Sequence, residues 1–326
     1  MRNHGPVPST DPDAFRLRVG GLVERELELD LAELRERFPA REVVATLQCA
    51  GNRRAGLIAV RDIPGEAPWG PAATGTAAWR GAALSDVLAA AGVRAEAAHV
   101  GFAGADTSEE PDPPERYGGS IPLRKARSEE VLLAWEMNGE RLLPEHGAPL
   151  RAVVPGYVGA RSVKWLERVD VRAEPWDGHY QAVAYRLLAP GTKPARGAGM
   201  ALGELPLSAD VLVPDDDAQV AAGTLEVLGY ALAGGQRYVA RVDVSADGGT
   251  TFREAELQED LGRWAWRMWR AEVELEPGPH ELVVRAWDSA GATQPEHASA
   301  VWNPKGYVNS SWARVGVVAS RSRPSS

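Results

Sequence analysis

The single cysteine of the chain, Cys49, is the residue whose chemistry is most distinctive. A thiolate is a good ligand for a soft metal–sulfur centre, and one cysteine cannot form a disulfide within the chain. Cys49 follows the β-branched run REVVATLQ and precedes Ala-Gly-Asn, a loop with room for a bulky ligand. Arg53 and Arg54 come next, and their positive charge favours a deprotonated thiol. On these residues alone, a small, inert, buried side chain remains the simpler interpretation.

Basic side chains between His146 and Leu166, in HGAPLRAVVPGYVGARSVKWL, form a second set of candidates. Arg151, Arg161 and Lys164 lie in this run, and forked guanidinium donors match the oxygens of phosphate groups. The stretch PLRAVVPG ends in PGYVGAR, which is typical of a strand that delivers a functional loop. Taken singly, each arginine or lysine is by default a solvated surface charge.

Short helices and strands must position these residues in the first half of the chain. Leu31, Leu34 and Phe38 recur at helical intervals, and SDVLAAAG is expected to be a helix that is capped by Ser85 and stopped by Gly92. Between the helices, REVVATLQC and PLRAVVPG are expected to be strands. The pattern predicts a mixed α+β domain.

The length of 326 residues favours two domains, since one domain usually takes roughly 100–200 residues. Residues 189–203, APGTKPARGAGMALG, have the Pro, Gly and Ala content of a linker. We place the boundary near Leu205, which predicts one domain at residues 1–204 and a second at residues 205–326.

The second half consists of short alternating runs between Gly-rich turns, such as TLEVLGYAL and HELVVRAWDSAG. This spacing predicts an all-β, immunoglobulin-like sandwich. Asp247, Gly248 and Gly249 supply the positive φ angles of a tight hairpin turn. Trp264 and Trp266 are two residues apart and are therefore expected on one face of a strand.

Composition excludes several classes of protein. The net charge of −9 and the pI near 5.3 argue against a general nucleic-acid binder. No apolar run approaches the roughly 20 residues that span a bilayer, and MRNHGPVPST lacks the apolar stretch of a secretory signal. We expect a soluble protein that does not act at a membrane. It is cytoplasmic by the absence of a signal, or periplasmic if a leader has been removed.

Four stretches together resemble the sulfite oxidase family of molybdenum enzymes. They are MRNHGPVP, TLQCAGNRR around Cys49, the run from His146 to Leu166, and WNPKGYVNSSWARV near the end. The resemblance extends from Arg2 to about Val318, and motifs of this length and order are far more specific than a short pattern. It implies an α+β molybdopterin-binding domain with the sulfite oxidase fold, followed by the immunoglobulin-like sandwich.

The resemblance implies a molybdenum–molybdopterin cofactor whose metal takes one protein ligand, Cys49, besides the pterin dithiolene and oxygen atoms. It makes an inert Cys49 a poor interpretation. The positions that match the family's cofactor contacts are His4, Cys49, Asp106, His146, Arg151, Arg161 and Lys164. Of these, Arg151, Arg161 and Lys164 are expected to face the phosphate end of the pterin.

A small dianion such as sulfite needs cationic hydrogen-bond donors. By resemblance, the substrate-side positions are Arg2, Arg54, Trp69 and Tyr185, and Tyr185 is expected to bind substrate and help relay protons. A fifth position lies in WNPKG, where sulfite-oxidising relatives usually have Arg and the nitrate-reducing branch often has Met. This chain has Lys305, which keeps the charge but loses the two-pronged fork, so orientation or preference for the anion is expected to differ.

The implied activity is oxidation of sulfite to sulfate by oxygen-atom transfer, with electrons passed to an external acceptor. The alternative within the family is reduction of nitrate or another oxidised compound, to which Lys305 lends weight. The wording GARSVKWL and the absence of Met at position 305 favour sulfite. A cofactor-free binding protein is a third interpretation, and it predicts no molybdenum after purification from a cofactor-competent host.

The expected partners follow from the same resemblance. A second cysteine for c-type haem attachment is absent, so we expect no haem and an external acceptor such as a c-type cytochrome or oxygen. The second domain usually mediates homodimers in this family, and the Trp-rich stretch WAWRMW could supply an apolar interface. The alternative is that these tryptophans fill the sandwich core.

Overall fold

The structure, a computed structural model, describes residues 3–321. The chain forms two compact units. Unit 1 comprises residues 1–50 and 76–203, and unit 2 comprises residues 51–75 and 204–326. Residues 51–75, which begin just after Cys49, therefore belong with unit 2.

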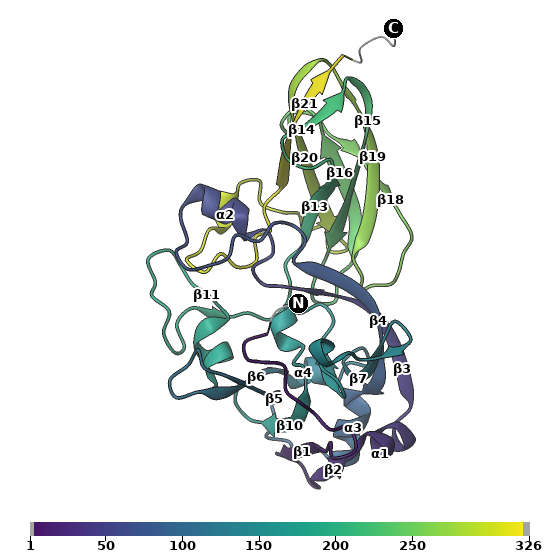
Figure 1. Cartoon of the computed structure of the whole chain (residues 1–326), viewed down its shortest axis with the longest axis vertical. Coiled ribbons are helices and arrows are strands. Elements are labelled where there is room, and N and C mark those ends of the chain that lie inside the picture. The colour runs from purple at the N-terminus through teal and green to yellow at the C-terminus, as the bar shows by residue number, and fades with distance from the viewer. Residues whose placement is uncertain (1–2, 322–326) are drawn as a thin grey trace. The chain divides into compact units, whose positions relative to one another are not determined.

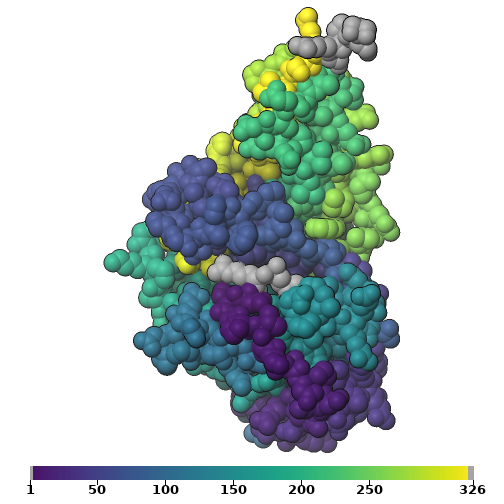
Figure 2. Space-filling view, viewed as in Figure 1, coloured from purple at the N-terminus to yellow at the C-terminus, as the bar shows by residue number. Residues whose placement is uncertain are grey.

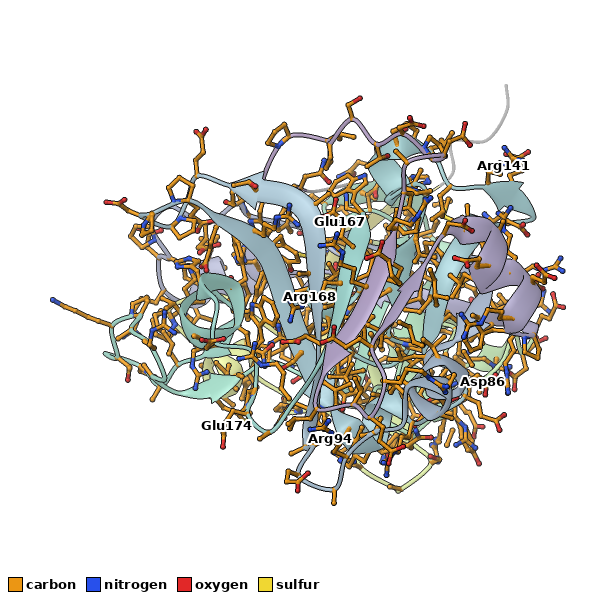
Figure 3. The ribbon with its side chains drawn as sticks, turned by 90° about the horizontal axis from the view of Figure 1, so that it is seen from below. Asp86, Arg94, Arg141, Glu167, Arg168 and Glu174 are labelled. Carbon is orange, nitrogen blue, oxygen red and sulfur yellow. The ribbon has the colours of Figure 1, made fainter. Side chains whose placement is uncertain are left out.

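The first sheet of unit 1 has five strands in the order β2-β1-β10-β5-β6. They are β1 (Leu17–Gly21), β2 (Leu27–Leu29), β5 (His99–Ser108), β6 (Glu115–Pro122) and β10 (Leu166–Arg172). Side chains alternate along the middle of β10, where Val169 and Val171 are buried, whereas Arg168, labelled in Figure 3, is exposed and Asp170 is half-buried. One face of the strand therefore packs into the core and the other faces solvent.

The second sheet of unit 1 carries two of the predicted functional segments. It has the order β3-β4-β7-β8, with a further strand, β9, paired to β7. The strands are β3 (Ala40–Gln48), β4 (Thr74–Ala83), β7 (Leu132–Met137), β8 (Glu140–Arg141) and β9 (Arg151–Val153) (Figure 1). Both strands predicted from the β-branched runs, β3 and β9, are confirmed. Cys49 follows the last residue of β3, and Arg151 is the first residue of the buried strand β9.

The helices are short. They are α1 (Leu31–Arg37), α2 (Arg54–Val60), α3 (Leu84–Ala91) and α4 (Leu123–Ala126). The predicted helix at Leu31 and Leu34 is confirmed as α1. It begins after Asp30, whose carboxylate accepts from the Glu33 amide while the Glu33 side chain accepts from the Asp30 amide. Within residues 3–321, no helix is both long and apolar enough to cross a membrane.

The helix α3 ends as predicted but begins differently. Gly92 stops it in the left-handed conformation, with φ of 71°. The prediction that Ser85 caps it was wrong, because the cap residue is Ala83. The Leu84 amide donates to the Val131 carbonyl at 2.8 Å, so a neighbouring backbone group satisfies this amide without a side-chain cap.

Short turns complete the chain. They are the 3-10 turns η1 (Pro144–His146), η2 (Gly159–Arg161) and η4 (Ala298–Val301), the π-helical turn η3 (Tyr180–Ala184), and the two-stranded ribbon of β11 (Arg186–Leu187) and β12 (Met200–Ala201). Of these, η2 and η3 end at or beside residues predicted to be functional, Arg161 and Tyr185.

Unit 2 contains two packed sheets, which confirms the predicted sandwich. One has the order β13-β15-β19-β18 and the other β14-β21-β20-β16-β17. The strands are β13 (Ser208–Val213), β14 (Ala218–Ala221), β15 (Gly223–Leu232), β16 (Val239–Ser245), β17 (Arg253–Glu254), β18 (Glu256–Leu257), β19 (Arg267–Leu275), β20 (Gly278–Asp288) and β21 (Ala313–Ser320). Buried side chains of both sheets, such as Trp269 and Val284, share one core. The last strand, β21, pairs in parallel with β14, and the two lie side by side at the surface (Figure 2).

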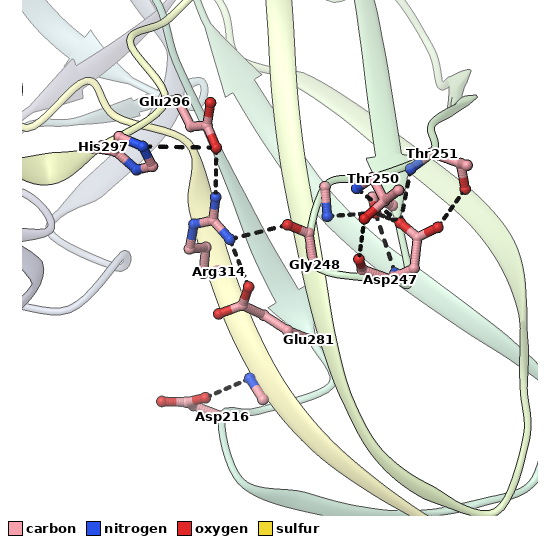
Figure 4. Close-up of polar contacts among 12 residues, drawn as sticks. Asp216, Asp247, Gly248, Thr250, Thr251, Glu281, Glu296, His297 and Arg314 are labelled. Atoms are coloured by element: carbon pink, nitrogen blue, oxygen red, sulfur yellow. Dashed lines mark hydrogen bonds and ion pairs between the residues drawn. The ribbon is translucent and has the colours of Figure 1, made fainter.

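The hairpin turn at Asp247 has the predicted geometry (Figure 4). Gly248 and Gly249 have φ angles of 71° and 94°. The Asp247 carboxylate accepts from the Thr251 hydroxyl at 2.6 Å and from the backbone amides of Thr250 and Thr251 at 3.0 and 2.9 Å. These hydrogen bonds to the charged form hold the pKa of Asp247 below its usual value.

The prediction that Trp264 and Trp266 share a strand face was wrong. Both precede β19, in a turn where the Ala265 amide donates to the Gly262 carbonyl at 3.1 Å. Gly262 has φ of 109°, so the chain is still turning where the sequence pattern indicated a strand. The tryptophan that fills the sandwich core is Trp269, which is 1% exposed.

Candidate functional site

Cys49 lies at the end of β3, beside the loop that contains η2. Gln48 forms a parallel bridge with Val158, which sets these two segments side by side. Gly159 permits the close approach, because a Cβ atom there would lie 3.1 Å from the Gln48 carbonyl oxygen. Cys49 itself is half-buried. Among residues 3–321, no three or more His, Cys, Asp or Glu side chains are grouped so that they could hold a metal ion. The sequence prediction does not need such a group, because it assigns the metal a single protein ligand, Cys49.

Arg151 and Arg161 are buried cations whose hydrogen bonds go to backbone carbonyl groups. Arg151 donates to His146 and Ser162 at 2.9 and 3.0 Å, and Arg161 donates twice to Leu202 at 3.1 and 2.7 Å. Within the described part of the chain, neither guanidinium forms an ion pair with a carboxylate. Burial lowers the pKa of Arg151 to about 10 and also lowers that of Arg161. An anionic ligand would stabilise both charges.

The charges of Lys164 and Asp106, both in unit 1, influence each other without forming an ion pair. The Lys164 ammonium donates to the Glu145 carbonyl at 3.0 Å and to the Asn3 side chain. Burial lowers the pKa of Lys164 to about 8 and raises the pKa of Asp106 to about 6, although the opposite charge of each partner acts in the other direction. Gly104 leaves space for Asp106, since a Cβ atom there would lie 2.5 Å from its Oδ1.

Several buried polar atoms of unit 1 have no hydrogen-bond partner in the part of the chain that the structure describes. They are Arg35 Nε, Gln48 Oε1, His99 Nδ1, Asp106 Oδ1, His146 Nδ1 and Arg161 Nη1. Buried polar atoms in folded proteins are nearly always satisfied, so this set favours a ligand that both donates and accepts hydrogen bonds. A pterin with a phosphate has this character, and three of the six atoms belong to residues predicted to contact it, namely Asp106, His146 and Arg161. These residues therefore fit the implied cofactor.

Tyr185 lies in an aromatic cluster that also holds His4. The Tyr185 hydroxyl and His4 Nε2 are 2.7 Å apart, although 181 positions separate the two residues. The His4 ring lies 5.2 and 4.2 Å from the ring centroids of Tyr117 and Tyr180. The Glu110 carboxylate lies 3.5 Å from His4 Nδ1 and accepts from the Tyr180 hydroxyl at 3.0 Å. The structure thus joins a predicted cofactor residue to a predicted substrate residue.

Sequence reasoning did not identify Tyr117, Tyr180 or Glu110 as part of this cluster. Burial raises the pKa of both tyrosines, so each hydroxyl stays protonated and able to donate. In the sequence, Tyr117 and Tyr180 resemble ordinary packing residues, and Glu110 is one of several acidic residues in a loop. The only sequence signal was the clustering of aromatic residues in HYQAVAY.

In unit 2, the predicted substrate residues Arg54 and Lys305 share one carboxylate, that of Glu66. Arg54 Nη2 lies 3.1 Å from Glu66 Oε2, and the Lys305 ammonium pairs with Glu66 Oε1. The side chain of Arg54 is 1% exposed, that of Glu66 15% and that of Lys305 24%, so solvent screens the trio only in part. No pattern in the sequence indicated Glu66 as part of the site.

The remaining predicted residues have different surroundings. Trp69 is 40% exposed, and Arg2 lies outside the described residues. Arg53, predicted to support a thiolate, is an ion-pair partner of the buried Asp210, with its Nε 2.8 Å from Asp210 Oδ1. Tyr230 donates to the same carboxylate at 3.2 Å. This buried network ties the segment 51–75 to the sandwich within unit 2.

Comparisons with known proteins match both halves of the chain. Residues 4–180 match the model of the oxidoreductase molybdopterin binding domain, and residues 200–320 match that of the Mo-co oxidoreductase dimerisation domain. A solved structure, the sulfane dehydrogenase SoxCD from Paracoccus pantotrophus, aligns with a TM-score of 0.80 and 26% identity. The alignment covers 94% of this chain and 76% of that one.

Curated relatives agree with these matches. Sulfite oxidase from Gallus gallus is 46% identical over 96% of this chain and 70% of its own length. The mitochondrial sulfite oxidase of Rattus norvegicus is 43% identical over 97% of this chain, which spans 60% of that protein. A nitrate reductase from Phaseolus vulgaris is more distant, at 36% identity over 97% of this chain and 38% of its own length.

Proposed function

The chain belongs to the sulfite oxidase family of molybdenum oxidoreductases, and from this we propose that it oxidises sulfite to sulfate with a molybdenum–molybdopterin cofactor. The observation that carries the proposal is the set of buried, unpartnered polar atoms in unit 1, which includes a residue adjacent to Cys49. When bound, the cofactor supplies the oxygen-atom transfer and the two-electron redox chemistry.

We assign the cofactor to residues of unit 1. Cys49 would provide the one thiolate ligand to molybdenum. Arg151, Arg161 and Lys164 would neutralise the phosphate of the pterin, in keeping with the burial of the two arginines without a carboxylate partner. Asp106, His146 and His4 would hold the donors and acceptors of the pterin ring through the polar atoms described above.

We assign the substrate to cationic and hydroxyl donors. Arg54 and Lys305 would attract the sulfite dianion, with Trp69 and Arg2 as further contributors by resemblance. The Tyr185 hydroxyl would donate to substrate while its hydrogen bond with His4 holds its orientation. The contact from His4 to the half-exposed Glu110 supports a path for protons released during turnover.

The partners follow from the family. The match of residues 200–320 to a dimerisation domain supports a homodimer. An external acceptor, such as a c-type cytochrome or oxygen, would remove the electrons, and this chain would bind no haem of its own.

The test is sulfite-dependent reduction of ferricyanide by protein purified from a cofactor-competent host. Cys49→Ala and nitrate reduction are assayed in parallel, and molybdenum and pterin are quantified in each preparation. We expect turnover with sulfite, loss of at least about a thousandfold in Cys49→Ala, and little reduction of nitrate. Molybdenum-loaded protein that is inert with sulfite would refute the substrate while leaving the cofactor intact. Protein that never acquires molybdenum would refute both.

A further inference from the structure

The Glu66 carboxylate contacts the two cations Arg54 and Lys305 of unit 2 in the way that an anionic ligand would. Its Oε2 lies 3.1 Å from Nη2 of Arg54, and its Oε1 pairs with the ammonium of Lys305. Each carboxylate oxygen thus takes a different cation. The oxygens of sulfite or sulfate are acceptors of the same kind, so an entering anion must compete with Glu66 for the same donors.

The Arg54 guanidinium has little freedom to find other partners. Its Nε donates to the carbonyl groups of Lys305 and Gly306 at 3.1 and 3.3 Å, and its Nη1 donates to Ala67 at 3.0 Å. A Cβ atom on Gly306 would lie 2.5 Å from Cγ of Arg54, so the surrounding backbone encloses the side chain. The edge that faces Glu66 is therefore the edge whose partner can change.

The formal charges of Arg54, Glu66 and Lys305 determine which anions this site prefers. Arg54 and Lys305 contribute two positive charges, and Glu66 removes one of them, which leaves a net charge of +1 at neutral pH. Because a Coulomb energy scales with the charge of the ligand, a nearby carboxylate penalises a dianion twice as much as a monoanion. A buried counter-ion of this kind sets selectivity as well as affinity.

We propose that Glu66 is a specificity-determining residue that weakens and tunes anion binding at the Arg54–Lys305 pair by acting as a built-in competitor. The proposal rests on the proposed role of this pair in binding the substrate anion. It gives Lys305 a distinct function as well, because the ammonium is held by Glu66 until an anion takes its place.

The experiment is calorimetric titration of the full, molybdenum-loaded chain with sodium sulfate and, separately, with sodium nitrate at constant ionic strength. Glu66→Gln keeps the size of the side chain and removes its charge. We expect sulfate to bind about tenfold more tightly to this variant and nitrate about threefold more tightly, since the monoanion feels half of the effect in free energy. The inhibition constant of sulfate against sulfite oxidation should fall in parallel.

Two further variants make the result decisive. Glu281→Gln removes an equal charge from the ion pair with Arg314 on the sandwich (Figure 4) and should leave both affinities unchanged. Glu66→Asp keeps the charge and should bind sulfate within about threefold of the parent chain.

Unchanged affinities in Glu66→Gln would overturn the proposal. So would an equal gain for sulfate and nitrate, because that result indicates a loosened site rather than a removed charge. The titrations do not depend on turnover. Failure to oxidise sulfite, with the expected shifts in binding, would refute the proposed function alone.

Discussion

The buried arginines of the two units are held in opposite ways. In unit 1, Arg151 and Arg161 donate to backbone carbonyl groups and, among residues 3–321, meet no carboxylate. In unit 2, Arg53 is paired with Asp210, and Arg54 with Glu66. Uncompensated charge is costly inside a protein unless a ligand neutralises it, whereas an internal ion pair is complete once the chain has folded. The difference separates residues suited to hold a large anionic cofactor from residues whose charge the folded chain already neutralises.

The comparison also explains how two kinds of anion can be treated differently by one chain. A pterin phosphate should be held permanently, and cations without an internal carboxylate favour that outcome. A substrate anion must be released after each turnover, and Glu66 offers Arg54 and Lys305 an alternative partner once the product leaves. The cofactor is thus retained by cations that lack an internal carboxylate, and the substrate anion is released from cations that have one.

The largest expected effect comes from breaking an internal pair. Arg53→Met leaves the carboxylate of Asp210 buried without its counter-ion, and burial already raises the pKa of Asp210 to about 6. We expect the free energy of unfolding at pH 7 to fall by about 3–5 kcal/mol. Chemical denaturation of the purified chain, followed by tryptophan fluorescence, measures the change.

The control is the double variant Arg53→Met with Asp210→Asn. It removes the stranded charge, so it should recover a large part of the lost stability. Equal stability of the single and double variants would mean that the ion pair is not the reason for the loss. The contrast between the units would then not hold for unit 2.

The second effect concerns the cation without a carboxylate. Arg161→Met removes a buried guanidinium whose Nη1 has no partner among the described residues. Hydrogen bonds to charged groups contribute about 1.5–3 kcal/mol, so we expect the affinity for the cofactor to fall by about tenfold to a hundredfold. Metal analysis and fluorescence of the released pterin measure the cofactor that is retained after dialysis.

The matched comparison is Arg53→Met, a buried arginine of the other unit. If the contrast holds, Arg161→Met loses more cofactor and Arg53→Met loses more stability. Equal cofactor losses in the two variants would contradict the assignment of the pterin phosphate to Arg161, because a general loosening of the fold would then account for both.

The sequence predicted the local structure well where local patterns determine it. The β-branched runs at β3 and β9, the helical spacing of Leu31 and Leu34, and the positive φ of Gly92 and Gly248 all follow from nearby residues. Ser85 failed as a cap because the carbonyl of Val131, the residue before β7, satisfies the first amide of α3. Such contacts depend on tertiary structure, which local spacing does not contain.

The partners of the candidate residues could not be predicted from local sequence either, because they too depend on tertiary structure. Glu66 and Lys305 are separated by 239 positions, so nothing near either residue indicates the pair. The resemblance to a family supplied Arg54 and Lys305 but not Glu66. Tyr185 and His4 were both predicted, yet their hydrogen bond required the fold to bring the chain's start to residue 185.

The smallest expected effect is a change in the pH dependence of stability, and it compares the buried acids of the two units. Burial raises the pKa of Asp106 to about 6, above its value in the unfolded chain, so the folded protein holds an extra proton between about pH 4 and pH 6. Its contribution to stability is present at low pH and is lost as pH rises through this window. In cofactor-free protein, Asp106→Asn should make the decline shallower by less than about 1 kcal/mol per pH unit, because a backbone hydrogen bond and the charge of Lys164 offset part of the effect of burial.

Asp210 titrates in the same direction and window, but Asp210→Asn also removes the partner of Arg53. That variant should therefore lose stability at every pH, whereas Asp106→Asn should not, since Asp106 forms no ion pair within residues 3–321. Denaturation at intervals of half a pH unit from pH 4 to pH 8 distinguishes the two profiles. Parallel profiles would show that the folded chain holds the Asp106 carboxylate of unit 1 as firmly as the Asp210 carboxylate of unit 2. The proposed contrast between a cofactor site in unit 1 and a complete ion pair in unit 2 would then be wrong.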